Sequence, residues 1–326
     1  MEFPCELREQ IEKKTEKIPL SVMKDIAAEL TEKYSKSDRM GKSFINSEKE
    51  ACVYAAVRMP ATFGAVSAAL SYALEMWNGD IKSVADVGAG TGAASWAFER
   101  LTDASSFTCI ERERVMRAIG SEFMISSGTS LSSSVWMNSD IIVDPVGVKA
   151  DAVVSSYVLN ELPAKQMENV IEKLWNAAEK LLLIVEPGTP DGFNVIKMAR
   201  KQLLKNGAHI IAPCTFEGKC SMADNDWCHF TCRVARSRLH KLIKSADVPY
   251  EDEKFSYIAF CRDEMQYNDR IHRILRHPDV KKGCIGFELC GSDGIFRTNV
   301  TKKDGETFKA ARKAQCGDVI DIVRKA

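Results

Sequence analysis

A glycine-rich loop at residues 86–92 constrains the fold of this chain more than any other feature. The loop reads Asp86-Val-Gly88-Ala-Gly90-Thr-Gly92; a strand expected over Lys82–Val87 precedes it, and a helix from about Ala93 to Leu101 follows. Glycine lets the backbone turn sharply and approach a ligand without a Cβ clash. Because such loops bind ligands where they join a strand to a helix, the sequence predicts a cofactor-binding α/β fold. The alternative is a glycine turn that binds nothing.

Strands and helices alternate after this loop. We expect further strands over Phe107–Ile110, Val135–Met137, Ala152–Ser155 and Leu181–Val185, with helices near Arg114–Ser126 and from Pro163 to Ala178. This alternation predicts an open parallel sheet with helices on both faces. The first 80 residues are expected to be helical, over Leu7–Tyr34 and Glu48–Trp77, with an interruption at Met59-Pro60.

We therefore predict an N-terminal helical region at 1–80 and an α/β domain at 81–326. The domain contains an insertion at about 187–250, with a helix ending at Asn206-Gly207 and a basic helix from about Arg233 to Ser245. The chain returns to the sheet as a strand over Phe255–Cys261. Gly291-Ser-Asp-Gly294 predicts a hairpin over 284–300. Since no linker is visible, we expect one compact body.

The glycine loop resembles that of class I S-adenosylmethionine methyltransferases. Its spacing differs from the GxGxxG of pyrophosphate binders, and an acid stands before it and another, Glu111, at the end of the next strand. The resemblance implies that Asp86, Gly88, Gly90 and Gly92 bind S-adenosylmethionine. It also implies that Glu111 accepts hydrogen bonds from both ribose hydroxyls. Glu113 is an alternative to Glu111, and Asp140 is a candidate for the adenine pocket or an ordinary loop residue.

The segment after the fourth strand contributes further candidates. The carboxyl ends of parallel strands face the ligand crevice, so Tyr157, Asn160 and Glu161 are expected to border the methyl donor. We assign Asn160 to the cofactor site; the alternative makes Asn160 and Glu161 simple helix-start residues. Neither an Asn-Pro-Pro-Tyr motif nor the cysteine nucleophile motif of base methyltransferases is visible. The sequence therefore predicts no catalytic residue.

Cysteines in the insertion form a second candidate site. Cys214-x5-Cys220-x7-Cys228 lies in a loop with little regular structure, which thiolate–metal bonds would hold in place. Four cysteines bind a [4Fe–4S] cluster and four Cys or His bind zinc. Candidates for the fourth ligand are Cys232, Cys284, Cys290 and His229, and the alternative is a set of free buried thiols.

Composition places this chain among ordinary soluble proteins of the cytoplasm. Eleven unevenly spaced cysteines do not suggest a secreted disulfide framework, and neither a secretory signal nor a membrane-length apolar run is evident. The net charge is zero, yet residues 197–244 carry ten Lys or Arg against three acids. This excess could contact phosphates; a solvated basic helix face is the alternative.

Longer motifs resemble one family, the methyltransferase-like assembly factors of the small ribosomal subunit, known from mitochondria and with prokaryotic relatives. The resemblance runs from about residue 45 to 320. It rests on the segments Tyr54–Thr62, Glu186–Phe193, Ala212–Cys214, Trp227–Phe230, Arg233–Arg236, Tyr250–Tyr257 and Ala311–Asp318. The chain departs from the family pattern at Cys316, where the family usually has Trp.

The family resemblance implies a [4Fe–4S] cluster held by Cys214, Cys220, Cys228 and Cys290. It also implies binding to small-subunit ribosomal RNA and proteins through the basic insertion, and we expect a monomer when the protein is free. The intact glycine loop favours an S-adenosylmethionine-dependent methyltransferase. The alternative is a non-catalytic assembly or translation factor that binds the cofactor without using it.

Overall fold

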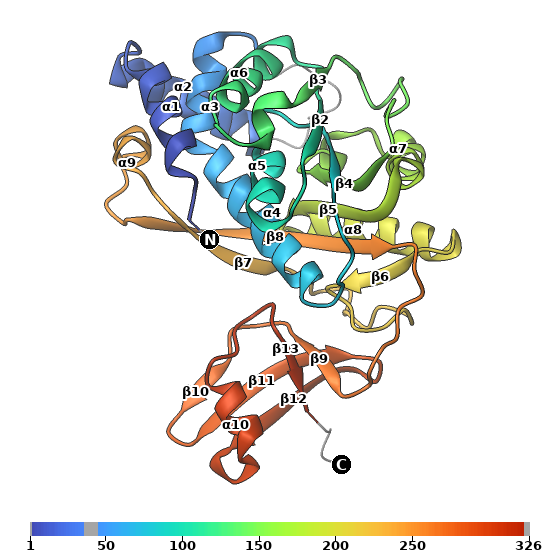
Figure 1. The fold of residues 1–326 in the computed structure, drawn as a ribbon. Coiled ribbons are helices and arrows are strands. Elements are labelled where there is room, and N and C mark those ends of the chain that lie inside the picture. Colours follow the sequence, from blue (N-terminus) through green and yellow to red (C-terminus); the bar gives the residue numbers. More distant parts are fainter. Residues whose placement is uncertain (1, 36–44, 323–326) are drawn as a thin grey trace.

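The computed structural model describes residues 2–35 and 45–322, and one mixed sheet forms its centre (Figure 1). The strand order is β3-β2-β1-β4-β5-β8-β6. Five strands are mutually parallel: β1 (Ser83–Val87), β2 (Ser106–Ile110), β3 (Val135–Met137), β4 (Ala150–Ser156) and β5 (Ala178–Pro187). The predicted parallel α/β sheet is confirmed.

Antiparallel strands complete the sheet beyond β5. The long strand β8 (Tyr250–Cys261) lies between β5 and β6 (His209–Ala212), and β7 (Phe230–Ala235) pairs with its first half. In this order β8 is the antiparallel strand before the last position, and the parallel strands joined by helices make the sheet Rossmann-like. Strands β1, β2, β4 and β5 all end at one edge, which is where ligands bind in such sheets.

Two hydrophobic cores cover the two faces of this sheet. One contains residues of the N-terminal helices together with α5 (Ala93–Leu101) and α6 (Arg114–Ile125). The other contains residues of α7 (Ala164–Ala177) and α8 (Pro190–Lys205). Strand β5 is apolar along its centre because helices bury it from both sides; Leu181–Val185 are fully buried.

The predicted N-terminal helices are confirmed and divide into four. They are α1 (Cys5–Thr15), α2 (Leu20–Ser35), α3 (Glu48–Val57) and α4 (Met59–Leu74). A capping box between Ser47 and Glu50 starts α3, and Arg58 separates α3 from α4, whose first turn contains Pro60. No single described helix is long and apolar enough to cross a membrane; α3 and α4 pass that test only together, across a bend of 48°.

The predicted basic helix over Arg233–Ser245 is wrong in its first half. Residues 230–235 form β7, and only α9 (Arg238–Lys244) is helical. Pairing with β8 determines this outcome: the Arg233 guanidinium forms an ion pair with Asp252 at 2.8 Å and lies over the Tyr250 ring. Long-range strand pairing therefore overrides a local pattern that is typical of a helix.

The C-terminal residues form a second sheet with its own hydrophobic core (Figure 1). The predicted hairpin is confirmed as β11 (Cys284–Gly291) and β12 (Gly294–Thr301). The sequence did not predict the strands that extend it: β9 (Ile271–Ile274), β10 (Asp279–Lys281) and β13 (Val319–Asp321). A short helix, α10 (Glu306–Ala311), packs against this sheet.

Candidate functional site

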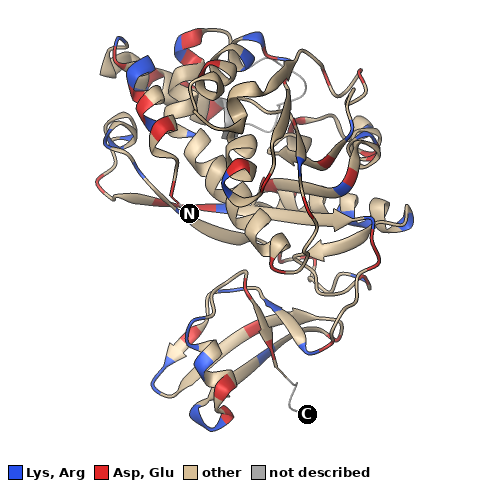
Figure 2. Ribbon diagram, in the orientation of Figure 1, with Lys and Arg blue, Asp and Glu red and all other residues tan. Residues whose placement is uncertain are grey.

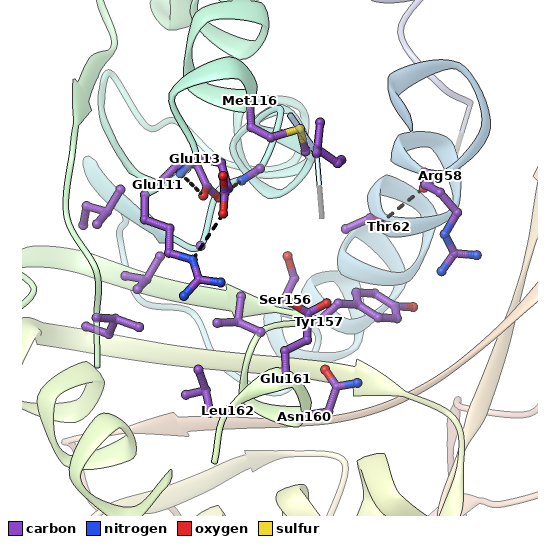
Figure 3. Close-up of a pocket in the computed structure, with 18 of the residues that line it drawn as sticks. Arg58, Thr62, Glu111, Glu113, Met116, Ser156, Tyr157, Asn160, Glu161 and Leu162 are labelled. Carbon is purple, nitrogen blue, oxygen red and sulfur yellow. Dashed lines mark hydrogen bonds and ion pairs between the residues drawn. The ribbon is translucent and has the colours of Figure 1, made fainter. Parts of the chain in front are cut away.

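A cavity of about 260 Å³ lies at the edge where the parallel strands end (Figure 3). Gly88 and Gly90 of the glycine loop line it, together with Glu111 after β2 and the segment 156–162 after β4. Tyr54 and Arg58 contribute from the N-terminal helices, and Glu253 from β8. These five separate parts of the chain therefore form one concave site.

The glycine loop has a backbone that only glycine adopts without strain. Gly88 and Gly90 have φ of 74° and 56°, in the left-handed region. A Cβ on Gly88 would lie 2.3 Å from Val158, so this glycine lets the loop pack against the turn after β4. A Cβ on Gly90 would have only Met116 within contact distance, at 3.5 Å, because this glycine faces the cavity.

The Glu111 carboxylate connects the glycine loop to the end of β2. The Gly90 N–H donates to its Oε2 at 2.8 Å and the Glu113 N–H donates to its Oε1 at 2.8 Å. Burial raises the pKa of Glu111, and these two backbone donors oppose the rise. Each carboxylate oxygen keeps a lone pair, so Glu111 can still accept hydrogen bonds from hydroxyl groups of a ligand.

A second carboxylate, that of Glu186 at the end of β5, holds the turn after β4. Its oxygens accept the Leu159 N–H at 2.9 Å and the Asn160 N–H at 3.3 Å. Glu186 is fully buried, and burial raises its pKa to about 8 despite these donors. Asn160 and Glu161 thus reach the cavity on a turn that Glu186 orients.

The described residues of the cavity wall carry a net negative charge. Arg58 and Arg112 are the two cations among them. Five carboxylates oppose them: Glu111, Glu113, Asp140, Glu161 and Glu253. An excess of negative charge in a partly desolvated cleft favours a cationic ligand.

The structure brings together four of the six residues predicted for cofactor binding. Gly88, Gly90, Glu111 and Asn160 line the cavity, whereas Asp86 and Gly92 are not among its lining residues. Asp86 is instead buried under the loop, where its Oδ2 accepts the Ser95 N–H at 3.0 Å and the Ser95 hydroxyl at 2.9 Å. Asp86 therefore does not face the cavity. It holds the first turn of α5, which follows the glycine loop.

Sequence reasoning missed Tyr54, Arg58 and Glu253. Tyr54 lies in α3 and Arg58 at the break before α4, where the apolar spacing indicated only packing, and Glu253 stands in a run of charged residues on β8. The family-like segments Tyr54–Thr62 and Tyr250–Tyr257 contain these residues, but the motifs gave them no role in the site. Tyr157, Glu161, Glu113 and Asp140, named as candidates or alternatives, do line the cavity.

The four predicted metal-ligating cysteines share one neighbourhood between the two sheets. Burial raises the pKa of Cys228 well above its usual range, and the adjacent Cys214, Cys290 and Cys220 raise it further. Burial likewise raises the pKa of Cys290 to about 12, again reinforced by Cys214 and Cys220. Yet within residues 2–35 and 45–322 no three His, Cys, Asp or Glu side chains stand close enough to form a ready metal site.

Three arginines hold the cysteine-bearing loop, residues 213–228. Arg200 on α8 donates to the Phe216 and Gly218 carbonyls. From the second sheet, Arg273 Nε donates to the Pro213 carbonyl at 2.8 Å, and Arg276 Nη2 contacts both carboxylate oxygens of Asp226. The loop is therefore fixed from both sheets.

A family comparison agrees with this architecture. The model of the family described as mitochondrial small ribosomal subunit Rsm22 matches residues 48–321, which include all the cavity-lining residues except Ile45 and every strand of the second sheet. The chain belongs to the Rsm22 family. The resemblance stated from the sequence motifs is thereby confirmed.

Individual relatives of this Rsm22-family chain are distant. Human mitochondrial ribosome assembly protein METTL17 is 26% identical over 291 residues, covering 83% of this chain and 62% of METTL17. The Schizosaccharomyces pombe Rsm22-cox11 tandem protein 2, mitochondrial, is 22% identical over 361 residues, covering 93% of this chain and 47% of the relative. The chain thus spans between about half and two thirds of these relatives.

Similar solved structures include two methyltransferases. The Synechocystis magnesium protoporphyrin IX methyltransferase with bound S-adenosylmethionine is 15% identical, at a TM-score of 0.41 over 74% of this chain and 97% of that chain. The plantazolicin methyltransferase BpumL is 11% identical, at a TM-score of 0.46 over 73% of this chain and 99% of that chain.

The buried Glu186 predicts a specific pH dependence of stability. Its folded-state pKa of about 8 exceeds its ordinary value of 4.5, so the folded protein keeps a proton that the unfolded chain has released between these values. Its contribution to stability therefore decreases as the pH rises through this window, by on the order of a few kcal/mol. Relative to Glu186→Gln, the melting temperature of the wild type should fall between pH 5 and pH 8. The same comparison with Glu179→Gln, at an exposed position of β5, should show no such trend.

Proposed function

We propose that this chain is a small-ribosomal-subunit assembly factor that binds S-adenosylmethionine at the edge of its Rossmann-like sheet. The cavity carries the proposal: the glycine loop, Glu111 and an acidic wall meet where such folds bind their ligands. Family membership supports the role in ribosome assembly. METTL17 is named as a ribosome assembly protein, and the family is described by the mitochondrial small ribosomal subunit.

The residues present fit the charge and shape of this cofactor. Glu111 can accept from the ribose hydroxyls while it holds Gly90, and the open side of Gly90 leaves room for the cofactor. The sulfonium group is a cation, which suits a wall with five carboxylates and two guanidinium groups. When bound, the cofactor supplies an electrophilic methyl group.

Replacing Gly90 tests the cofactor site. Gly90→Leu places a side chain in the cavity and forces a bulky residue into φ of 56°, so binding of S-adenosylmethionine measured by calorimetry should be lost. Gly128→Leu is the matched control, since Gly128 has φ of 70° and nothing within 4 Å of a Cβ there. Unchanged affinity of the Gly90 variant would refute the assignment.

We further propose that Cys214, Cys220, Cys228 and Cys290 hold a [4Fe–4S] cluster. Two buried cations support this idea. Arg273 is 1% exposed and Arg200 is 8% exposed, and neither forms an ion pair with a described carboxylate. Arg273 Nη2 and Arg200 Nε also lack hydrogen-bond partners in the described structure. Buried charges need compensation, which four metal-bound thiolates beside them would provide.

Metal analysis tests the cluster. Protein purified without oxygen should contain about four irons per chain and absorb as iron–sulfur proteins do. Cys290→Ser should lose most of the iron, whereas Cys284→Ser, six residues earlier on the same strand, should keep it. Zinc in place of iron would contradict the cluster, and full iron content in Cys290→Ser would contradict the ligand set.

We also propose that ribosomal RNA contacts the insertion through exposed lysines of α8. Lys197, Lys201 and Lys205 stand four residues apart and so share one face of this helix, which carries blue segments in Figure 2. Three other cations of the insertion are used internally: Arg233 and Arg236 pair with acids of β8, and Arg200 holds the cysteine-bearing loop. The proposed RNA surface therefore uses fewer cations than the ten Lys and Arg of residues 197–244.

The salt dependence of RNA binding tests this surface. Changing Lys197, Lys201 and Lys205 to Gln should weaken binding to small-subunit RNA and reduce the slope of log affinity against log salt by roughly 2 to 3. A triple variant of the exposed Lys13, Lys17 and Lys24 in the N-terminal helices removes the same charge and should leave the slope unchanged. Equal slopes for wild type and the α8 variant would show that RNA binds elsewhere.

A further inference from the structure

The cavity has a second wall, opposite the glycine loop, whose residues no motif assigns. Figure 3 shows Arg58 and Thr62 across the cavity from Glu111 and Glu113, with Tyr157 between them and the turn at Asn160. Glu253 of β8 belongs to the same wall, because the Tyr157 hydroxyl donates to its Oε1 at 2.8 Å. If the cofactor ribose lies at Glu111, this wall is the side on which a methyl acceptor enters.

Glu253 differs from Glu111, Glu113 and Asp140 in its partner. Glu111 accepts two backbone N–H groups, Glu113 and Asp140 interact with Arg112, and Asp140 also accepts the Ile142 N–H. These bonds position the protein's own loops. In the described structure the Glu253 carboxylate accepts a hydrogen bond from a neutral phenol, which orients it without neutralising its charge.

The surroundings of Glu253 suit exchange of a proton. Burial raises its pKa, while Arg58 from the α3–α4 break and the Tyr157 hydroxyl lower it and Glu251 on its own strand raises it. Cys232 of β7 is a further titratable neighbour. A carboxyl whose pKa moves from its ordinary value toward neutrality is a better general base at physiological pH.

Tyr157 is held in an unusual conformation that serves this contact. Its φ of 61° is rare for a bulky residue, and its N–H donates to the Val185 carbonyl at 2.8 Å. Burial and the adjacent Glu253 raise the pKa of Tyr157 well above its ordinary value, so it remains a phenol and a donor. Strain of this kind persists where the surroundings impose it.

We propose that Glu253 is the proton acceptor for methyl transfer to an N–H or O–H group, and that Tyr157 and Arg58 position it. The inference rests on the proposed cofactor site. In the step, the acceptor lone pair forms the bond to the methyl carbon, the carbon–sulfur bond breaks with its electron pair going to sulfur, and the acceptor proton passes to Glu253. The products are the methylated acceptor, the neutral thioether and a protonated carboxyl group.

The residue types in the cavity favour this class of acceptor over a carbon atom. Transfer to a ring carbon of a base by the covalent route needs a cysteine nucleophile, and no cysteine is among the described residues that line the cavity. A nitrogen or oxygen acceptor needs only orientation and removal of a proton, which this wall can supply.

The test compares Glu253→Gln with wild type, using radiolabelled S-adenosylmethionine and immature small subunits. The variant should still bind S-adenosylmethionine by calorimetry, yet at saturating cofactor it should label the subunits roughly 100- to 10,000-fold more slowly. The wild-type rate should fall as the pH is lowered, because protonated Glu253 accepts no proton, and the variant should lose this acid limb. Tyr157→Phe should shift the pH at which the rate falls, and it should keep partial activity.

Glu251→Gln is the matched control, since Glu251 lies two residues away on β8, pairs with Arg236 and does not line the cavity. A binding readout needs no turnover: wild type should prefer S-adenosylmethionine over neutral S-adenosylhomocysteine more strongly at pH 8 than at pH 6. In Glu253→Gln this preference should depend less on pH.

Each outcome decides the inference. Full labelling by Glu253→Gln overturns it. A wild type that binds the cofactor but labels nothing also overturns it, while the proposed cofactor-binding function stands. A wild type that does not bind the cofactor overturns both.

Discussion

Two carboxylates at the ends of parallel strands hold the ligand edge of this protein together. Glu111 after β2 accepts backbone N–H groups from the glycine loop and from its own turn, and Glu186 at the end of β5 accepts those of the turn after β4. A carboxyl group taken out of water needs such donors, and buried loop N–H groups need acceptors. The cavity exists because both requirements are met at adjacent strand ends.

The zero net charge of the chain conceals two environments of opposite sign. The cavity wall carries more carboxylates than guanidinium groups, whereas the cysteine-bearing loop is surrounded by Arg200, Arg273 and Arg276. Each arrangement fits its proposed occupant, a sulfonium cation in the first and a thiolate-bound cluster in the second. If both proposed ligands bind, these opposite local charges would favour a cation in the cavity and an anionic cluster at the cysteines.

The cysteine-bearing loop also joins the two sheets. Arg273 reaches from β9 to the Pro213 carbonyl, and a Cβ on Gly294 at the hairpin turn would lie 3.7 Å from the Ser221 hydroxyl. The second sheet has a separate hydrophobic core, so its attachment depends on polar contacts of this kind. A metal bound there would add covalent strength to that junction.

Local patterns in the sequence determined the parallel strands, their helices and the glycine loop, since apolar periodicity and glycine spacing act over a few residues. They also indicated Glu111 and Asn160, because strand ends meet at one edge. Tertiary structure alone decided the rest. Residues 230–235 became a strand through pairing with β8, and Tyr54, Arg58 and Glu253 met Tyr157 from segments some 100 residues or more apart. Contacts over such separations depend on how the whole sheet folds, and no short motif encodes them.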